Sequence, residues 1–318
     1  MLNLPKKVTV VEVGPRDGLQ SFPNWVETDT KVEMIDRLSA AGYPVIEVTN
    51  FAHPKVIPNL SDAEEVMARI KRRPGTVYRA LVPNACGAER AAKTDCDEML
   101  GLITVSKTYL AKNQNMERDE AIDQGVKAFE IAEKAGAKFI MALGMALWCP
   151  YEGRIDEDDS LAVAQRYYDA GIRRFYFAGS VGMEDPRHVN ALFARANERF
   201  ADAEFGWHVH NLAGMGTANI IAALDGGATS IEGAICGLGG GIVMPTTMGS
   251  VGNFPSEDIV HMLNEMGIET GVDTVAAKEA AADIAKMIDI EPRSHITHCG
   301  TRADVQLKGQ KNPRAHPV

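Results

Sequence analysis

The chain has few cysteines, a shortage of basic residues and no long apolar run. Its cysteines are odd in number and widely spaced, and they form no Cys-x-x-Cys motif; they are Cys86, Cys96, Cys149, Cys236 and Cys299. This pattern argues against a disulfide framework and fits reduced thiols in a reducing compartment. We therefore expect a cytoplasmic protein.

Basic residues are outnumbered by acidic ones, 33 to 43, so the net charge is -10 at pH 7. Such a charge makes nucleic acid and anionic membrane surfaces poor partners. No apolar stretch approaches the roughly 20 residues that span a bilayer. The segment Met1–Lys7 also lacks the apolar core and cleavage pattern of a signal peptide. We expect neither a nucleic acid nor a membrane as a partner.

Within the 318 residues, β-branched runs alternate with stretches of helical spacing. The predicted strands are 8–13, 44–49, 77–82, 99–105, 138–143, 174–178, 205–210 and 230–236. The helices predicted between them are 28–41, 61–73, 89–93, 119–135, 160–170, 186–199 and 216–224. Alternation at a pitch of roughly 30 residues is typical of a parallel sheet with crossover helices.

We predict an α/β fold of the (β/α)₈ TIM-barrel type, because the length and the number of repeats match a closed barrel. A doubly wound open sheet is the alternative, but it has fewer strands and usually a Gly-x-Gly-x-x-Gly after the first, which is absent here. Further helices are predicted at 257–266 and 274–287. Residues 1–290 should form the barrel domain, and 291–318 a C-terminal segment with a frayed polar tail from Lys308.

In a TIM barrel the active groups lie at the carboxyl ends of the strands. His208 and His210 end the seventh predicted strand. Residues two positions apart on a strand project to the same face, so both imidazoles can bind one divalent ion. The alternative is two unrelated polar residues where a strand leaves the core. The other polar residues at predicted strand ends are Arg16, Asp17, Gln20, Glu47, Asn50, Ser106, Ser180 and Asn253.

Several segments carry a family resemblance. Val11-Glu-Val-Gly-Pro-Arg-Asp-Gly-Leu-Gln20 resembles the opening motif of the 3-hydroxy-3-methylglutaryl-CoA lyases, a group within the metal-dependent TIM-barrel lyases and condensing enzymes. Later segments resemble the same family in the same order, namely 46–51, 149–153, 208–210, 237–240 and 252–253. A single Arg-Asp pair carries little information, whereas colinear segments at barrel-compatible spacing are specific.

The resemblance implies that Asp17, His208, His210 and Asn253 hold a divalent cation. One carboxylate, two imidazoles and one amide oxygen suit Mg²⁺ or Mn²⁺ at least as well as Zn²⁺, since no thiolate is needed. It also implies that Arg16, Asp17 and Glu47 stand in the catalytic centre. We further expect contacts to substrate from Gln20, Asn50, Ser106 and Ser180.

Cleavage of a 3-hydroxyacyl thioester between its second and third carbons has three requirements. The hydroxyl proton must be removed, the hydroxyl oxygen polarised and the departing thioester enolate stabilised. A metal can chelate the hydroxyl and a neighbouring carboxylate, and Arg16 can face the developing enolate oxygen. The resemblance thus implies a lyase that splits 3-hydroxy-3-methylglutaryl-CoA, or a related acyl-CoA, into an acyl-CoA and a keto acid.

Each of these residues also has a structural interpretation. Arg16 and Asp17 can simply pair with each other in a loop, and Glu47 can be an ion-pair partner inside the barrel mouth. Asn253 can be a turn residue in a left-handed conformation, which asparagine tolerates. Gln20, Asn50, Ser106 and Ser180 are ordinary hydrogen-bonding residues at strand ends.

Three features depart from the family. Gly241 stands where the family usually has a cysteine taken to help proton transfer, and Gly179 stands where it has an aspartate. The loop from Gly241 to Asn253 is about three residues longer and apolar. Cys236 is a conceivable substitute for the missing thiol, but at a strand end it is better read as a small buried residue. Glu47 or a metal-bound water would have to take over proton handling.

Two rival functions remain open from the sequence. One keeps the metal but makes the protein a condensing enzyme or a CoA-independent aldolase. The other, motivated by Gly179 and Gly241, is a catalytically lapsed metal-binding barrel; the retained charged cluster argues against it. We expect a homo-oligomer, with a dimer favoured and the C-terminal helices as a candidate surface.

Overall fold

The computed structural model describes residues 2–114, 116–240 and 252–311. Eight parallel strands close into a barrel in the order β1-β10-β9-β8-β5-β4-β3-β2. They are β1 Thr9–Glu12, β2 Val45–Asn50, β3 Val77–Leu81, β4 Glu98–Thr104, β5 Lys138–Gly144, β8 Arg174–Gly179, β9 Glu204–Val209 and β10 Ser230–Gly233. The predicted TIM barrel is therefore confirmed.

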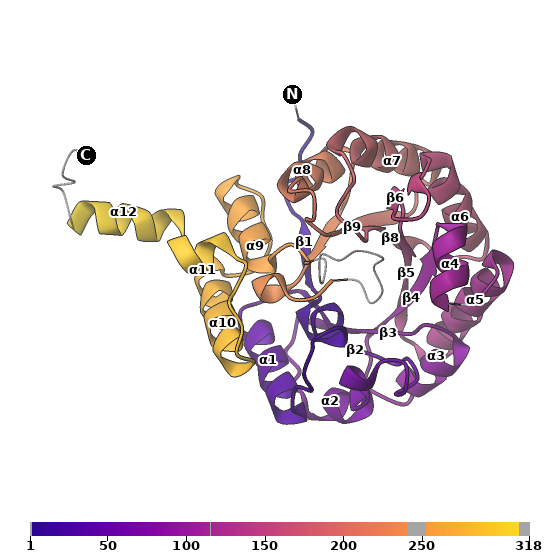
Figure 1. Cartoon of the computed structure of the whole chain (residues 1–318), viewed down its shortest axis with the longest axis horizontal. Coiled ribbons are helices and arrows are strands. Elements are labelled where there is room, and N and C mark those ends of the chain that lie inside the picture. Colours follow the sequence, from indigo (N-terminus) through magenta and orange to yellow (C-terminus); the bar gives the residue numbers. More distant parts are fainter. Residues whose placement is uncertain (1, 115, 241–251, 312–318) are drawn as a thin grey trace.

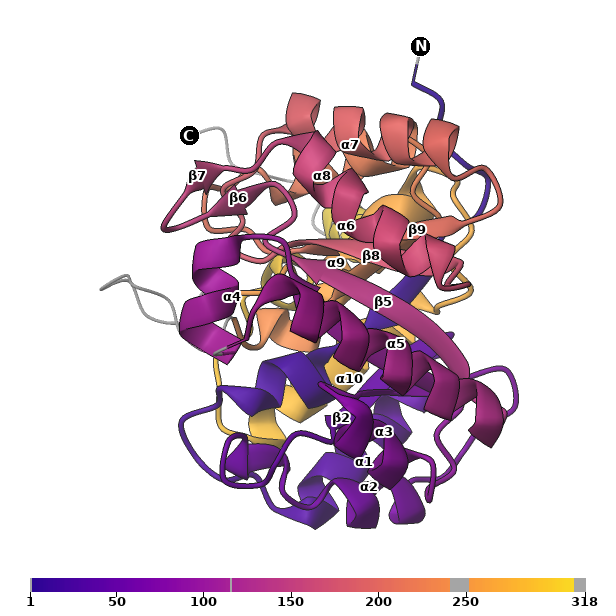
Figure 2. The same ribbon diagram turned by 90° about the vertical axis from the view of Figure 1, so that its right-hand side faces the viewer.

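Helices surround the strands, as Figure 1 shows in a view down the barrel. Those between strands are α1 Thr28–Ala40, α2 Ala63–Arg69, α3 Ala85–Ala91, α4 Lys107–Gln114, α5 Arg118–Ala135, α6 Glu157–Asp169, α7 Pro186–Arg199 and α8 Gly216–Asp225. A short hairpin of β6 Trp148–Cys149 and β7 Gly153–Arg154 precedes α6. In the side view of Figure 2, α1 and α2 lie at one side of the barrel and α7 and α8 at the other.

Four helices follow the barrel strands. They are α9 Ser256–Glu265, α10 Thr274–Met287, α11 His295–Cys299 and α12 Arg302–Lys311. The first two match the predicted helices and pack on each other and on the barrel, α10 against α1 and α9 against β1. In Figure 1, α12 extends away from the ring of helices. No helix among the described residues combines the length and apolarity needed to cross a bilayer.

Two local predictions were wrong. The helix predicted at 61–73 is shorter, because Ile70 is extended (φ -62°, ψ 143°) and ends α2 at Arg69. The tail predicted to fray from Lys308 is helical through Lys311, while 312–318 lie outside the described residues. A capping box explains α12, since Thr301 N–H donates to Asp304 Oδ2 at 2.9 Å and Asp304 N–H donates to Thr301 Oγ1 at 3.2 Å.

The barrel interior is divided between apolar and charged side chains. Alternate residues of β3, β4, β5 and β8 form a small apolar cluster, made of Leu81, Leu100, Ile140, Ala142, Tyr176 and Ala178. The remaining inward positions include Arg79, Glu98 and Glu232, each at most 1% exposed. Bulky branched apolar residues dominate most TIM-barrel interiors. The buried charges in this half of the barrel therefore need an explanation.

Candidate active site and metal centre

The segment after β1 brings two charged residues to the barrel mouth. The carbonyl of Val13 accepts the N–H groups of Arg16, Asp17 and Gly18 at 3.1, 2.7 and 3.3 Å. These bonds fold Gly14–Gly18 into one π-helical turn, η1. The sequence had predicted only a loop there, because the segment is rich in glycine and proline. The turn thereby fixes the directions in which the consecutive side chains of Arg16 and Asp17 project.

Arg16 joins two carboxylates with different nitrogens. Its Nε donates to Glu47 Oε1 and its Nη1 donates to Asp17 Oδ1 at 2.7 Å. All three residues are buried, with exposed fractions of 4% for Arg16, 6% for Asp17 and 0% for Glu47. The predicted pairing of Arg16 with Asp17 therefore exists, but it is one part of a larger cluster.

The two histidines at the end of β9 converge. His208 Nε2 and His210 Nε2 lie 3.0 Å apart, and His210 Nε2 lies 3.8 Å from Asp17 Oδ2. Ligand atoms of the three residues all lie within 4.8 Å of one another. Two ligands about 2.1 Å from one ion and at right angles to each other are about 3 Å apart. The spacing therefore suits a common cation.

Asn253 lies beside this triad because its backbone forms an antiparallel bridge with His210. Its Nδ2 donates to Asp17 Oδ2 at 2.7 Å and to the Leu238 carbonyl at 2.9 Å. Its Oδ1 is buried and has no hydrogen-bond partner among the described residues. A buried acceptor without a partner is costly, and a cation bound beside Asp17 would remove that cost. The donor set present in the chain thus fits a hard or borderline divalent ion.

The electrostatics of the cluster favour the ligand form of Asp17. Burial alone would raise the pKa of this carboxyl, but Arg16 and the two histidines hold it well below its usual range. Burial lowers the pKa of His210. For His208, burial is outweighed by the carboxylates of Glu232 and Asp17, which raise its pKa. Burial also raises the pKa of Glu47, against the opposing effect of Arg16.

The four residues expected to contact substrate fall into two groups. Gln20 Nε2 donates to Asp17 Oδ1 at 2.7 Å, so Gln20 belongs to the cluster. The other three accept hydrogen bonds from backbone N–H groups. Asn50 Oδ1 accepts from Ala52 N–H at 2.7 Å, and Ser180 Oγ accepts from the N–H of Met145, which follows β5, at 2.9 Å. Ser106 Oγ accepts from Tyr109 N–H at 3.0 Å in the first turn of α4.

Three buried charged residues near the site were missed by sequence reasoning. Glu232 Oε2 lies 3.3 Å from His208 Nδ1, and Arg79 Nη1 donates to Glu232 Oε1 at 2.6 Å. Glu184 is 2% exposed, and neither of its carboxylate oxygens has a hydrogen-bond partner among the described residues. Glu232 and Arg79 could have been found from the sequence, because a charged residue inside a predicted apolar strand requires a buried partner.

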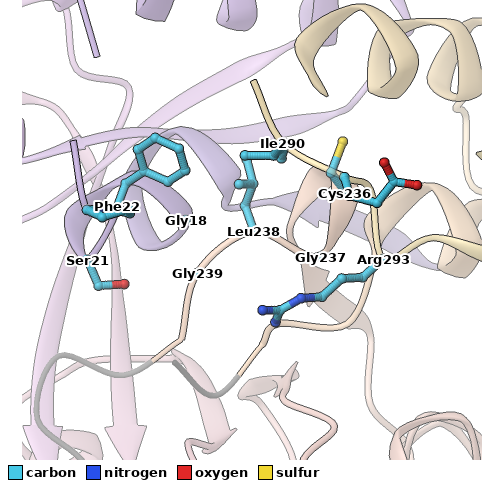
Figure 3. A pocket seen from close by; sticks show the side chains of 11 residues that line it. Gly18, Ser21, Phe22, Cys236, Gly237, Leu238, Gly239, Ile290 and Arg293 are labelled. Carbon is cyan, nitrogen blue, oxygen red and sulfur yellow. The ribbon is translucent and has the colours of Figure 1, made fainter. Parts of the chain in front are cut away.

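A cavity of about 200 Å³ lies beside the cluster, between η1 and the 3₁₀ turn η3, Ile235–Gly237 (Figure 3). Phe22 and Arg293 line it from different segments of the chain. Cys236 also lines it, but its thiol is buried and donates to the Ala281 carbonyl at 3.2 Å. Cys236 is thus the small buried residue that the sequence indicated.

Comparison with known proteins decides the family. The profile of the HMGL-like family matches residues 7–284. The chain belongs to the HMGL-like family. It is 37% identical to hydroxymethylglutaryl-CoA lyase YngG of Bacillus subtilis over 84% of this chain and 89% of that protein. It is 33% identical to human mitochondrial hydroxymethylglutaryl-CoA lyase over 93% of this chain and 90% of that protein.

The fold agrees with solved structures of HMGL-like proteins. An HMG-CoA lyase from Acinetobacter baumannii, in complex with coenzyme A and 3-methylmalate, superposes with a TM-score of 0.88 at 31% identity, covering 98% of each chain. The sequence-based assignment to the HMG-CoA lyase family is confirmed. Members of this family depend on a divalent metal, and Asp17, His208 and His210 form a possible site for it.

The features expected from the sequence to depart from the HMG-CoA lyases fall in different parts of the chain. Gly241 and the loop from 242 to 251 lie outside the described residues. Gly179 ends β8, and a Cβ on it would lie 2.8 Å from Glu184 Oε2 and 2.8 Å from the Trp207 ring. The carboxylate of Glu184 therefore fills the space into which a side chain at position 179 would project.

Proposed function

We propose that this HMGL-like chain is a divalent-metal-dependent carbon-carbon lyase. Its substrate would be 3-hydroxy-3-methylglutaryl-CoA or a related 3-hydroxyacyl-CoA, split into an acyl-CoA and a keto acid. The observation that carries the proposal is the convergence of Asp17, His208 and His210 within 4.8 Å, with Arg16 hydrogen-bonded to Asp17. The lyases among its relatives support the same reaction class.

Asp17, His208, His210 and Asn253 are the proposed cation ligands. The side-chain carboxylate, the two facing Nε2 atoms and the unpartnered Asn253 Oδ1 support this set. When bound, Mg²⁺, Mn²⁺ or Zn²⁺ would supply Lewis-acid polarisation of the substrate oxygens. The carboxylate and amide oxygens suit Mg²⁺ or Mn²⁺, and the proposed set needs no thiolate, so these two ions are preferred over Zn²⁺.

Arg16 is proposed to stabilise the enolate oxygen that develops during cleavage. Burial opposes its charge, but Glu47 and Asp17 outweigh that effect and raise the pKa of the guanidinium, so it stays protonated. Its position is fixed by two carboxylates before substrate arrives. A prepositioned cation of this kind lowers the barrier because little reorganisation is required.

Glu47 is proposed to handle the hydroxyl proton in the absence of the family cysteine. One of its oxygens accepts from Arg16, while Oε2 has no hydrogen-bond partner among the described residues. Burial raises its pKa, against the opposing effect of Arg16, and a carboxylate with a raised pKa is a stronger base. Gln20, Asn50, Ser106 and Ser180 are proposed as substrate contacts, and only Gln20 has direct support from contact with Asp17.

A panel of thioesters tests which acyl group the protein accepts. The coenzyme A and 3-methylmalate in the Acinetobacter structure make a 3-methylmalyl thioester a second candidate, since it is also a 3-hydroxyacyl-CoA. Purified, Mn²⁺-loaded protein is assayed for the acyl-CoA and the oxo acid from each thioester; the oxo acid is a keto acid from a tertiary hydroxyl and an aldehyde acid from a secondary one. Formation of both products supports the lyase, whereas release of CoA without an oxo acid overturns it. Activity only in the joining direction identifies a condensing enzyme, and no turnover of any thioester identifies a lapsed barrel.

Three further assignments accompany this function. We propose a cytoplasmic location, supported by five cysteines that are all free. We propose a barrel domain over 1–290 followed by a C-terminal segment over 291–318. We also propose a homodimer through the C-terminal helices, supported by the exposed Val305 and Leu307 of α12, with light scattering of the full chain as the test.

A further inference from the structure

A buried charged network crosses the interior of the barrel. Arg79 on β3 donates from Nε to Glu98 Oε1 at 2.7 Å and from Nη1 to Glu232 Oε1 at 2.6 Å. The three side chains are 2%, 1% and 0% exposed. Removing charges from water is costly even when they are paired. Apolar residues of similar volume often give equal or greater stability than buried ion pairs, so we ask what else the network does.

Strand register builds this network. Arg79 pairs with Glu98 across β3 and β4, and Glu47 pairs with Arg79 across β2 and β3. On the other side of the barrel, Glu232 pairs with His208 across β10 and β9. Arg79 reaches across the interior to Glu232, and so links β3 with the strand next to the proposed metal ligands.

One branch of the network ends at His208. Glu232 uses Oε1 for Arg79 and Oε2 for His208 Nδ1, at 3.3 Å. An ionised carboxylate can only accept, so this contact places the ring proton on Nδ1. In the neutral ring, which is the form that binds a metal, the lone pair is then on Nε2, the atom that faces His210 at 3.0 Å. Carboxylates that hold a metal-binding histidine in this way also fix the orientation of its ring.

A second branch leads to Arg16. Arg79 Nη1 lies 3.8 Å from Glu47 Oε2, and Glu47 Oε1 accepts from Arg16 Nε. Glu47 therefore lies between two guanidinium groups, and one buried arginine is connected to both His208 and Arg16. The two proposed parts of the site share a single rigid support.

We infer that Arg79 and Glu232 are positioning residues, which orient His208 for metal binding and hold Glu47 against Arg16. Neither residue is placed in contact with metal or substrate. The inference rests on the proposed metal site and adds to it a buried support that reaches from β3 through β10 to β9.

The test is calorimetric titration of Mn²⁺ into the full chain and its Glu232→Gln variant. The amide keeps the shape of the side chain but loses the charge that holds both Arg79 and His208. We expect the Kd for Mn²⁺ to weaken about 10- to 100-fold, as is typical for such supporting residues.

Asp62→Asn is the matched control. Asp62 is also a carboxylate paired with a buried cation, Lys31, at 2.8 Å, and its side chain is 9% exposed. It lies at the N-terminus of α2, outside the network. We expect its Kd for Mn²⁺ to stay within about twofold of the unmodified chain. Equal weakening in both variants would indicate general loss of stability and overturn the positioning role.

Nitrogen-15 NMR of labelled histidine in metal-free protein supplies a second readout. We expect His208 to be protonated at Nδ1 in the unmodified chain, and to lose that preference in Glu232→Gln. A folded Glu232→Gln with unchanged Kd and unchanged tautomer would overturn the inference. Absence of Mn²⁺ binding by the unmodified chain would instead overturn the proposed function.

Arg79→Lys is the alternative variant for the Mn²⁺ titration if Glu232→Gln does not fold. Lysine keeps the positive charge, but its ammonium cannot span Glu98 and Glu232 as the guanidinium does. We expect a Kd about tenfold weaker. Affinity equal to that of the unmodified chain in Arg79→Lys would contradict the inference.

Discussion

The carboxylate of Glu184 lies against Gly179, so that a Cβ on Gly179 would come within 2.8 Å of Glu184 Oε2. This contact connects Gly179, where the sequence was expected to depart from the family, with a buried acid that sequence patterns did not reveal. Glu184 has no hydrogen-bond partner for either oxygen among the described residues. Its neighbours, including Trp207, leave no room for a second side chain.

Restoring aspartate at position 179 should therefore destabilise the protein. Gly179→Asp places a second carboxylate against Glu184, and overpacking of this kind costs about 1–3 kcal/mol, with charge repulsion in addition. Denaturant unfolding measures the loss. The double variant Gly179→Asp with Glu184→Ala should recover part of it, because the space of Glu184 is vacated while the Trp207 ring stays against position 179. Strictly additive losses in the double variant would show that the two positions do not compete.

Glu184 should also make the stability of the fold depend on pH. Burial raises its pKa from the ordinary 4.5 to about 7. Between these values the folded chain holds a proton that the unfolded chain has released. The free energy of unfolding should therefore fall as pH rises through this window, by about 3 kcal/mol from this group alone.

Glu184→Gln removes that titration. Its free energy of unfolding should change less between pH 4.5 and 7 than that of the unmodified chain. Chemical denaturation at several pH values provides the measurement, with Glu133→Gln as a control at an exposed carboxylate. If Glu184→Gln and the unmodified chain show the same pH dependence, the carboxyl ionises normally.

Replacing Arg16 by lysine should remove most of the catalysis. The ammonium keeps the charge but cannot bridge Glu47 and Asp17 as the Arg16 guanidinium does. We expect kcat to fall about a hundredfold or more, while Mn²⁺ affinity changes much less. Arg173→Lys, at an exposed pair with Asp202, is the control. A kcat within a few-fold of normal would rule out a role for Arg16 in the transition state.

Glu47→Gln should separate proton handling from substrate binding. The amide can still accept from Arg16, but it cannot take up a proton from the substrate hydroxyl. We expect kcat to fall about a hundredfold or more, with little change in KM or in Mn²⁺ affinity. Steady-state kinetics at saturating Mn²⁺ gives the comparison. A fall in Mn²⁺ affinity that matches the fall in kcat would mean that Glu47 supports the site structurally.

Much of the fold was predictable because its signals are local. Each predicted strand overlaps an observed one, as 174–178 does with Arg174–Gly179, since β-branched and aromatic runs flanked by turn residues occur within a few positions. Helix α4 was missed, because Lys107–Gln114 has no apolar periodicity. It begins where Ser106 Oγ accepts from Tyr109 N–H, and this same contact occupies a hydroxyl that was expected to meet substrate.

The parts of the site that lie in motifs or at strand ends were predictable. The two histidines on one strand and the Arg16-Asp17 pair follow from spacing and from the barrel rule. The link from Arg79 to Glu232 does not, because the two residues are 153 positions apart and meet only through strand register. Glu184 was equally hidden, since its burial depends on a glycine at the end of the preceding strand.

The most direct test of the metal site is calorimetric uptake of Mn²⁺ by the unmodified chain and by His208→Ala. We expect one ion per chain for the unmodified protein and no measurable uptake by the variant, because one of three converging ligands is removed. His298→Ala, in α11 and remote from the triad, should bind as the unmodified chain does. Unchanged uptake of Mn²⁺ by His208→Ala would show that Asp17, His208 and His210 do not form the metal site.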